Sequence, residues 1–297
     1  MSKAKVVVVG SLNMDMVSHS LRLPAPGETL VGHDFVMAPG GKGGNQAVAA
    51  ARLGASVAFV SRVGTRQHGE ALLQALRDEG IDTSGSTVDP QALPGIAVIM
   101  VASEGGENSI VYVPGSNADL SPADVQASRA LLQAAKVVVA QLEVPMPAIA
   151  EAFAIARAAG VTTVLNAAPA LQVSDELLAV SDWLVVNETE AGQMSGEAEP
   201  LAAAHALLKR GPRQVLVTLG AQGALLVTGE GVQTASAATV KAVDTVGAGD
   251  TFVGGLATGL AEGMTAIEAV RLGQAAAAIA VSRSGVQSAM PRRAELS

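Results

Sequence analysis

Short runs of β-branched residues alternate with alanine- and leucine-rich stretches, and this alternation constrains the fold more than any other feature of the chain. The first run is four consecutive valines, Val6–Val9, and the first helical stretch follows at 45–53, ended by Gly54. Strands separated by such helices are typical of a parallel sheet with helices on its faces. Because the valine runs are continuous, the strands are expected to be covered on both sides. The sequence therefore predicts an α/β fold.

The same alternation predicts the other elements. Further strands are expected at 57–60, 136–140, 162–166, 183–186 and 215–219, and helices at 70–79, 147–159, 201–209 and 251–262. Two stretches, 13–39 and 95–114, break the pattern, and the second is typical of a hairpin with strands at 96–101 and 109–113 around a turn at 104–107. They form either a small separate β-layer or edge strands of the main sheet, and the pattern alone leaves both open.

Composition excludes several classes of protein. The 297 residues include no cysteine, which rules out disulfides and thiolate metal sites. Nineteen basic and 27 acidic side chains give a net charge of −8, whereas nucleic-acid binding needs a basic surface. No apolar run approaches the ~20 residues that cross a bilayer, and the N-terminal stretch is too short and β-branched for a secretory signal. We therefore expect one cytoplasmic domain over residues 1–297, with no nucleic-acid or membrane partner.

The most informative segment is a glycine turn that leads directly into a helical pattern. Gly247-Ala248-Gly249-Asp250 precedes the helix expected at 251–262. A helix start offers unpaired N–H groups and a positive dipole, and glycines let a phosphate approach the backbone. Asp250 would lie beside that phosphate, where a carboxylate is useful if it takes a proton from an attacking hydroxyl. For this segment alone, an Asp-capped helix after a glycine turn is the simpler alternative.

A second glycine-rich segment, Gly40-Gly41-Lys42-Gly43-Gly44-Asn45, also precedes a helix but lacks the spacing and the Ser/Thr of a Walker A loop. Its glycines suit a loop that lies flat against a polar ligand, with Lys42 and Asn45 bonding hydroxyl groups; a flexible loop is the alternative. After the first strand, Asn13 and Asp15 share one face if the chain is extended. They suit sugar hydroxyls, although an Asx turn explains them more simply.

Weaker signals follow two later strands. Asn187 and Glu190 would share the first turn of a helix, where they could hold waters of Mg²⁺ or simply form a capping box. The segment 218–223 ends another strand in a glycine turn suited to nucleotide contact. The first strand is not followed by Gly-x-Gly-x-x-Gly, which argues against a nicotinamide-dependent dehydrogenase. The four histidines show no metal-ligand spacing and are expected at the surface: His19, His33, His68 and His205.

Together and in this order, these segments resemble the PfkB family, the ribokinase-type carbohydrate kinases. The resemblance spans nearly the whole chain and rests on 10–15, 40–45, 187–190, 218–220 and 244–250, with support from 26–29 and 141–143. It implies a Rossmann-like, mainly parallel sheet flanked by helices, with a small β-sheet lid from about 13–39 and 95–114. It also implies ATP-dependent phosphorylation of a sugar's primary hydroxyl, here O5 of D-ribose, to give D-ribose 5-phosphate and ADP.

The resemblance further implies roles for individual residues. Asp250 would be the catalytic base, and the amides of Gly247, Ala248, Gly249 and Asp250 would form the anion hole. Ribose would contact Asn13, Asp15, Gly41, Lys42, Gly43, Gly44, Asn45, Glu143 and Asp250. ATP would contact Asn187, Thr218, Leu219, Gly220, Ala221, Gln222, Gly223, Gly249 and Gln274, with Glu190 acting on Mg²⁺ through water. K⁺ would be held at Asp244, Val246, Ala280, Arg283, Gly285 and Ala289, and shared lid strands would make a homodimer.

The sequence departs from the family pattern at two places. Thr65-Arg66 occupies a turn in which relatives usually carry acidic residues, which puts the local ligand or loop geometry in question. Ala289 replaces a frequent serine of the cation site, a change that would weaken K⁺ binding without abolishing it. The nearest alternative is a related kinase for 2-deoxyribose or a nucleoside; Phe35 and Tyr112 are too few aromatics to favour the latter. A further alternative is a non-catalytic sugar or nucleotide sensor. Such a protein could dispense with Asp250, so the presence of Asp250 argues against it.

Overall fold

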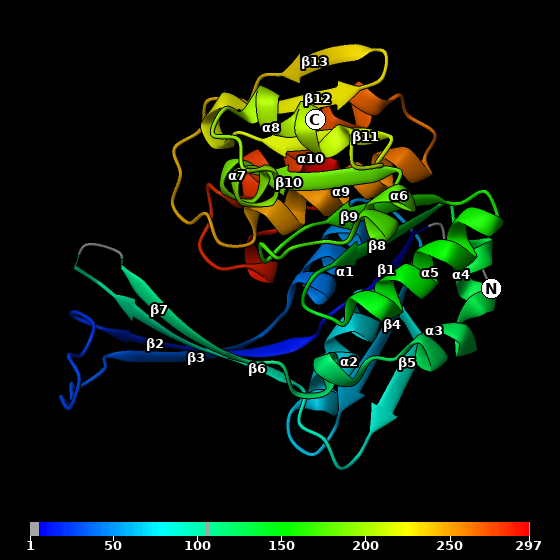
Figure 1. The fold of residues 1–297 in the computed structure, drawn as a ribbon. Helices are drawn as coiled ribbons and strands as arrows, with labels where there is room; N and C mark the ends of the chain where they lie inside the picture. The colour runs from blue at the N-terminus through cyan, green and yellow to red at the C-terminus, as the bar shows by residue number, and fades with distance from the viewer. Residues whose placement is uncertain (1–5, 105–106, 297) are drawn as a thin grey trace.

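The computed structural model describes residues 6–104 and 107–296. Its main sheet consists of β1 (Val6–Val9), β4 (Val57–Gly64), β5 (Asp82–Asp89), β8 (Val137–Gln141), β9 (Thr162–Asn166), β10 (Trp183–Asn187), β11 (Gln214–Thr218), β12 (Ala224–Thr228) and β13 (Gly231–Ala235). The strand order is β13-β12-β11-β10-β9-β8-β1-β4-β5 (Figure 1). All pairs from β11 to β5 are parallel, and β12 and β13 add antiparallel strands at one edge. The expected mainly parallel sheet is confirmed.

Helices cover both faces of this sheet. One face carries α1 (Lys42–Arg52), α2 (Gly69–Asp78), α9 (Ala248–Ala261) and α10 (Ala266–Ala280). The other carries α3 (Pro122–Ala127), α4 (Arg129–Ala134), α5 (Met146–Ala158), α6 (Asp175–Ala179), α7 (Glu188–Ser195) and α8 (Pro200–Leu208). Val6 and Val8 pack into the first layer and Val7 and Val9 into the second, so the continuous valine run reflects burial on both faces.

The two stretches that break the helix–strand rhythm form a second sheet, here called the small sheet. It contains β2 (Asn13–Ser20), β3 (Asp34–Gly40), β6 (Gly95–Ala102) and β7 (Asn108–Val113), in the order β3-β2-β6-β7. Figure 1 shows it projecting from the body of the molecule. The alternative that these stretches are edge strands of the main sheet is therefore wrong. The β6–β7 hairpin is confirmed, while part of its expected turn, 105–106, lies outside the described residues.

Several element boundaries differ from expectation, and those at the two glycine-rich segments bear most on the site; β4 also runs to Gly64 rather than ending at 60. Helix α1 begins at Lys42 rather than at 45, and α9 begins at Ala248 rather than at 251. Both glycine segments are thus parts of helix N-termini, and the flexible-loop alternative for 40–45 is wrong. Within the described ranges, no helix combines the length and hydropathy that a membrane span requires.

Candidate active site

The predicted site residues converge at the edge of the main sheet where the parallel strands end. The segments after β1 and β8 supply Asn13 and Glu143, and the ends of β10 and β11 supply Asn187 and Thr218. Ligands of open α/β sheets bind at this edge. Helix α1 also begins at this edge: the backbone N–H of its first residue, Lys42, donates to Glu143 Oε2 at 3.0 Å.

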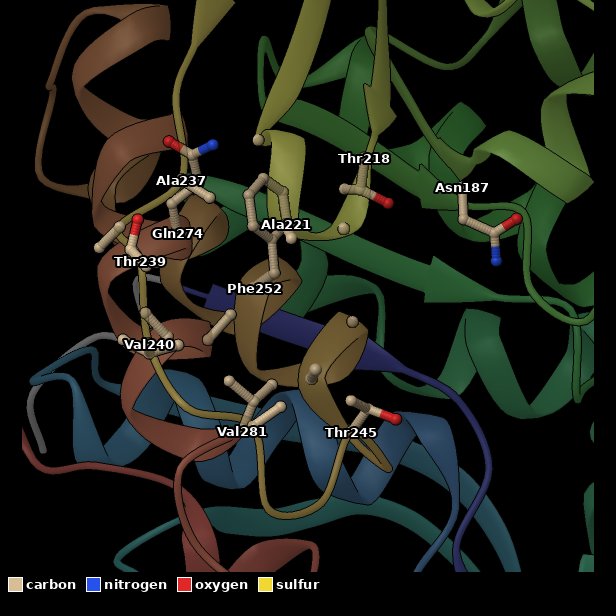
Figure 2. Close-up of a pocket in the computed structure, with 18 of the residues that line it drawn as sticks. Asn187, Thr218, Ala221, Ala237, Thr239, Val240, Thr245, Phe252, Gln274 and Val281 are labelled. Atoms are coloured by element: carbon tan, nitrogen blue, oxygen red, sulfur yellow. The ribbon is translucent and has the colours of Figure 1, made fainter. Parts of the chain in front are cut away.

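A cavity of about 620 Å³ lies between the ends of β10 and β11 and the helices α9 and α10 (Figure 2). Figure 2 shows the polar side chains of Asn187 and Thr218 on one side and Thr239 and Gln274 on the other. Gln274 is oriented by its Nε2, which donates to the carbonyl of Ala235 at 2.7 Å. A largely apolar wall with a few placed polar groups, at this size, suits a nucleotide.

This cavity gathers most of the residues expected to bind ATP. Its wall includes Asn187, Thr218, Gly220, Ala221, Gly223, Gly249 and Gln274. Leu219 and Gln222 are not in that wall, because Leu219 packs against the core and Gln222 faces solvent. The sequence did not predict the part of this wall at 237–242, nor Phe252 and Val281. Residues 237–242 precede the 244–250 motif and carry no motif of their own, so no local signal could identify them.

A second cavity of about 200 Å³ adjoins the first at Gly249 and Phe252, which line both. Lys42, Glu190 and Asp250 line the second cavity. It lies at the N-terminus of α9, where the N–H groups of the first turn have no partner within the helix. Together with the helix dipole, these groups favour an anion beside the Asp250 carboxylate.

Two glycines shape the start of α9 in different ways. Gly247 adopts φ +75°, and a Cβ there would lie 2.5 Å from Val286 Cγ1, so a side chain would be strained and would clash. A Cβ on Gly249 would meet no atom within 4 Å, which leaves open space beside the backbone. The turn therefore combines a fixed backbone with an accessible surface, as phosphate binding requires.

The Asp250 carboxylate is buried, with 7% of its residue surface exposed, and amide groups hold both of its oxygens. Asn45 Nδ2 donates to Oδ2 at 2.9 Å, and Gln46 Nε2 donates to Oδ1 at 3.0 Å. Gln46 also donates to Asn166 Oδ1 at 3.0 Å. Asn45 was predicted at this site, whereas Gln46 and Asn166 were not, although Gln46 directly follows the glycine-rich segment.

A polar cluster lies beside the start of α1. Ser11 Oγ donates to Glu143 Oε2 at 2.5 Å, and Asn13 Oδ1 accepts from Asn117 Nδ2 at 2.7 Å. The Asp15 carboxylate lies against Gly40, where a Cβ would come within 2.0 Å of Asp15 Oδ2. The cluster thus presents carboxylate and amide groups, which suit hydroxyl ligands.

The glycines of 40–44 are explained in part by packing rather than by a ligand. A Cβ on Gly43 would lie 2.6 Å from the backbone N of Ser11, and Gly41 adopts φ +85°. The glycines at 40 and 43 therefore let the start of α1 press against β2 and the segment after β1. This packing brings Asn45 toward α9 and Lys42 toward Glu143.

Burial and like charges shift the protonation of this site. The pKa of Asp15 is raised to about 7 by burial and then by the charges of Glu143 and Asp250. Burial also raises the pKa of Glu190. For Lys42, burial opposes the charged form, but the carboxylates of Asp250, Glu143 and Glu190 outweigh it and raise its pKa. The site therefore keeps one ammonium group among several carboxylates.

Known proteins match this chain over nearly its whole length. The family model of the pfkB family carbohydrate kinases matches residues 3–293. The chain belongs to this family. A ribokinase from Haemophilus influenzae is 43% identical over 98% of this chain and 96% of its own length. A solved structure of Arabidopsis thaliana ribokinase complexed with ribose and ATP has a TM-score of 0.91 and 32% identity, covering 99% and 97% of the two chains. A deoxyribokinase from Salmonella typhi is 34% identical over 96% of this chain and 95% of its own.

Asn187 and Glu190, the residues expected to hold waters of Mg²⁺, form a capping box with both reciprocal hydrogen bonds at 2.8 Å, so the capping-box alternative is confirmed. The Glu190 carboxylate nevertheless lines the same cavity as Asp250. No cluster of three or more acidic or histidine side chains suited to a metal occurs among the described residues. A single carboxylate beside a phosphate site fits Mg²⁺, which keeps much of its water.

The expected cation residues come from two parts of the chain: Asp244 and Val246 precede α9, whereas Ala280 ends α10 and Arg283, Gly285 and Ala289 follow it. Asp244 Oδ1 accepts from the backbone N of Val246 at 3.0 Å, and Oδ2 accepts from that of Gly285 at 3.2 Å. The N–H of Arg283 donates to the carbonyl of Ala280 at 3.1 Å. The structure thus brings Asp244, Val246 and Gly285 together. Carboxylate and carbonyl oxygens are hard donors that fit an alkali cation.

The two departures from the family pattern have clear structural settings. In the turn before α2, the N–H groups of Thr65 and Arg66 donate to the carbonyls of Asp89 and Ala92, so the backbone holds the turn without acidic side chains. Ala289 is buried in a short 3₁₀ helix, Gln287–Ala289, with 2% of its surface exposed.

Proposed function

We propose that the protein transfers the γ-phosphoryl group of ATP to O5 of D-ribose, giving D-ribose 5-phosphate and ADP. The main observation in support of this proposal is the position of Asp250. Its carboxylate lines the cavity adjoining the nucleotide-sized one and is hydrogen-bonded to Asn45, next to the polar cluster of Asn13, Asp15 and Glu143. The name ribokinase on a full-length relative at 43% identity supports the same reaction.

In the proposed reaction, Asp250 accepts the proton of the ribose 5-hydroxyl as that oxygen attacks the γ-phosphorus. The new O5–P bond forms while the bond between the γ-phosphorus and the bridging oxygen of ADP breaks, and ADP leaves with the electron pair. The amides of 247–250 and the dipole of α9 stabilise the charge on the transferring group. The Lys42 ammonium, in the same cavity wall, adds positive charge at this point.

Ribose would occupy the polar cluster. Asn13, Asp15, Glu143 and Asn45 would offer donors and acceptors to its hydroxyl groups. The start of α1 packs against Ser11 and Asn13 and would lie beside the sugar, with Gly41, Lys42, Gly43 and Gly44. A site built for a hydroxyl discriminates against an analogue that lacks it, because its polar groups are then left unpaired. We therefore favour ribose over 2-deoxyribose, the second candidate, which a deoxyribokinase relative at 34% identity keeps open.

Two cations complete the proposal. Glu190 would hold Mg²⁺ through water, and the ion would neutralise charge on the ATP phosphates. The loops around Asp244 and Gly285 would hold K⁺ next to the anion hole, with oxygen donors from Val246, Ala280 and Arg283. Since Asp244 is hydrogen-bonded to both loops, an ion there would fix the turn that begins α9.

We also propose a homodimer through the small sheet, which would act as a lid over the sugar. Its strands expose large apolar side chains, among them Phe35 at 59%, Ile110 at 57% and Val111 at 60%. By the strand register, Phe35, Val98 and Val111 share one face of the small sheet, whereas Ile110 lies on the other. Exposed apolar side chains gathered on one face are typical of a protein–protein contact. The cytoplasmic location expected from the sequence stays a prediction.

A substrate panel tests the function directly. The purified protein should release ADP from MgATP with D-ribose, and kcat/KM for ribose should exceed that for 2-deoxyribose by at least about tenfold, with adenosine lower still. Mass spectrometry of the product should place the phosphate on the pentose. A preference for 2-deoxyribose or adenosine would contradict the proposed substrate, and no transfer to any sugar or nucleoside would favour a non-catalytic sensor.

Omitting K⁺ from the assay should lower the rate of ribose phosphorylation.

A further inference from the structure

Two chains of side-chain amides end on the Asp250 carboxylate, one on each oxygen. In the first, Gln287 Nε2 donates to Asn45 Oδ1 at 3.0 Å and Asn45 Nδ2 donates to Asp250 Oδ2 at 2.9 Å. In the second, Gln141 Nε2 donates to Gln46 Oε1 at 2.6 Å and Gln46 Nε2 donates to Asp250 Oδ1 at 3.0 Å. We propose that Gln46 is a positioning residue for Asp250 and that Gln141 fixes the orientation of Gln46, an inference that rests on the proposed phosphoryl transfer.

The second chain is buried from end to end. Gln46 is 1% exposed and Gln141 is fully buried. Because Gln46 Oε1 accepts from Gln141, its NH₂ group must face Asp250 and Asn166, and both of its hydrogens are used. The reverse orientation would place the amide oxygen of Gln46 against two acceptor oxygens. Gln141 therefore selects the one orientation in which Gln46 can hold the carboxylate.

Gln141 is a polar side chain in a strand whose residues are all buried. Its Oε1 has no hydrogen-bond partner in the part of the chain that the structure describes, and a Cβ on Gly10, which packs against it, would lie 2.2 Å from this oxygen. An apolar side chain of similar size would need no partner at this position. Contact with Gln46 supplies a reason for an amide at this point of β8.

Neutral donors suit a residue that must accept a proton. Each Asp250 oxygen receives one hydrogen bond, which fixes the rotation of the carboxylate and leaves a second lone pair for the sugar hydroxyl. A cationic partner in place of Gln46 would form an ion pair that opposes protonation of the base. Proton transfer also requires the base to lie within hydrogen-bond reach of the hydroxyl, so small displacements reduce the rate strongly.

The test compares Gln46→Met, Gln141→Met and the double variant. Gln46→Met removes the donor at similar length, and kcat for ribose should fall by about 10- to 100-fold while the KM values of ribose and ATP change by less than about threefold. Gln141→Met should lower kcat by a smaller factor, since Gln46 can still donate but loses its fixed orientation. The double variant should be no slower than Gln46→Met alone, because the two residues act as one unit.

Thr163→Val is the matched control. Thr163 is fully buried in β9, and its hydroxyl exchanges hydrogen bonds with Asp182 near the start of that strand, away from the site. This variant should lose thermal stability but keep kcat. Gln46→Asn retains an amide that is one methylene too short for Asp250, so it should match Gln46→Met and provide a second variant if the first fails to fold.

Three results would overturn the role of Gln46. The first is a kcat within about threefold of wild type in both Gln46 variants. The second is a fall in kcat in the Gln46 variants that is no larger than the fall in Thr163→Val. The third is a double variant in which the fold losses in kcat of the two single variants multiply. Calorimetric binding of ADP and ribose verifies that each variant is folded. Absence of ribose phosphorylation in the wild-type protein would instead reject the proposed function, and the two failures are therefore distinguishable.

Discussion

At the scale of the single residue, Asp15 carries a strongly perturbed carboxyl group in the proposed sugar site. Burial and then the charges of Glu143 and Asp250 raise its pKa to about 7. An aspartate in an unfolded chain has a pKa of about 3.9. Between these two values the folded protein binds a proton that the unfolded chain has lost. The Asp15 contribution to the free energy of unfolding therefore decreases as the pH rises from about 4 to about 7, and is constant above.

Substituting Asp15→Asn removes this contribution, because an amide does not titrate. The difference in unfolding free energy, variant minus wild type, should increase as the pH rises toward about 7 and then level off. Urea denaturation of the ligand-free proteins at several pH values between about 5 and 8 measures this difference. Parallel stability profiles over that range would show that Asp15 ionises in the folded protein at its ordinary pKa.

At the scale of the element, the close contact between α1 and α9 determines how Asp250 meets its amide partners. Gly254 lies one turn after Asp250, and a Cβ there would lie 2.5 Å from Ala49 Cβ and 2.9 Å from the carbonyl oxygen of Gln46. Only glycine permits this approach of the two helices. The separation of α1 and α9 is therefore coupled directly to the hydrogen bonds from Asn45 and Gln46 to Asp250.

Gly254→Ala should therefore lower both stability and activity. Alanine normally stabilises a helix interior by about 1 kcal/mol relative to glycine. Here the overpacked contact should reverse the sign and destabilise the protein by about 1–3 kcal/mol, with a fall in kcat. Gly229→Ala is the control, since a Cβ at Gly229 meets no atom within 4 Å. Denaturation and steady-state kinetics of both variants measure the effect; equal stability and kcat in both would show that the helices do not need this contact.

At the scale of the whole molecule, the parts of the fold that could be predicted are those whose cause is local in the chain. The run Val6–Val9 predicts a strand because every residue is buried, and Gly54 marks the end of α1 because it adopts φ +102°. Strand β5, Asp82–Asp89, was missed because it is a polar, half-exposed edge strand without a valine run. The small sheet was expected as one of two alternatives, and only long-range pairing such as β2 with β6 decides between them.

The candidate site likewise contains residues that local motifs predict and residues that only long-range contacts identify. Asp250 and Asn45 were predicted because each lies in a short motif beside a helix start. No role was predicted for Gln46, Gln141 or Asn166, because their hydrogen bonds join positions 95 to 204 residues apart and no spacing along the chain reports such contacts. The roles of these three side chains follow from geometry that only the folded chain provides.

The central claim is that the folded chain places one carboxylate, Asp250, between the nucleotide cavity and the sugar cluster as a general base. The most direct test measures ribose 5-phosphate formation and ligand binding for Asp250→Ala, with Asp78→Ala, at an exposed position in α2, as the control. We predict that kcat falls by about 10²- to 10⁴-fold in Asp250→Ala while the dissociation constants of ribose and ATP change little. Turnover within about tenfold of wild type, with both ligands bound normally, would contradict the claim.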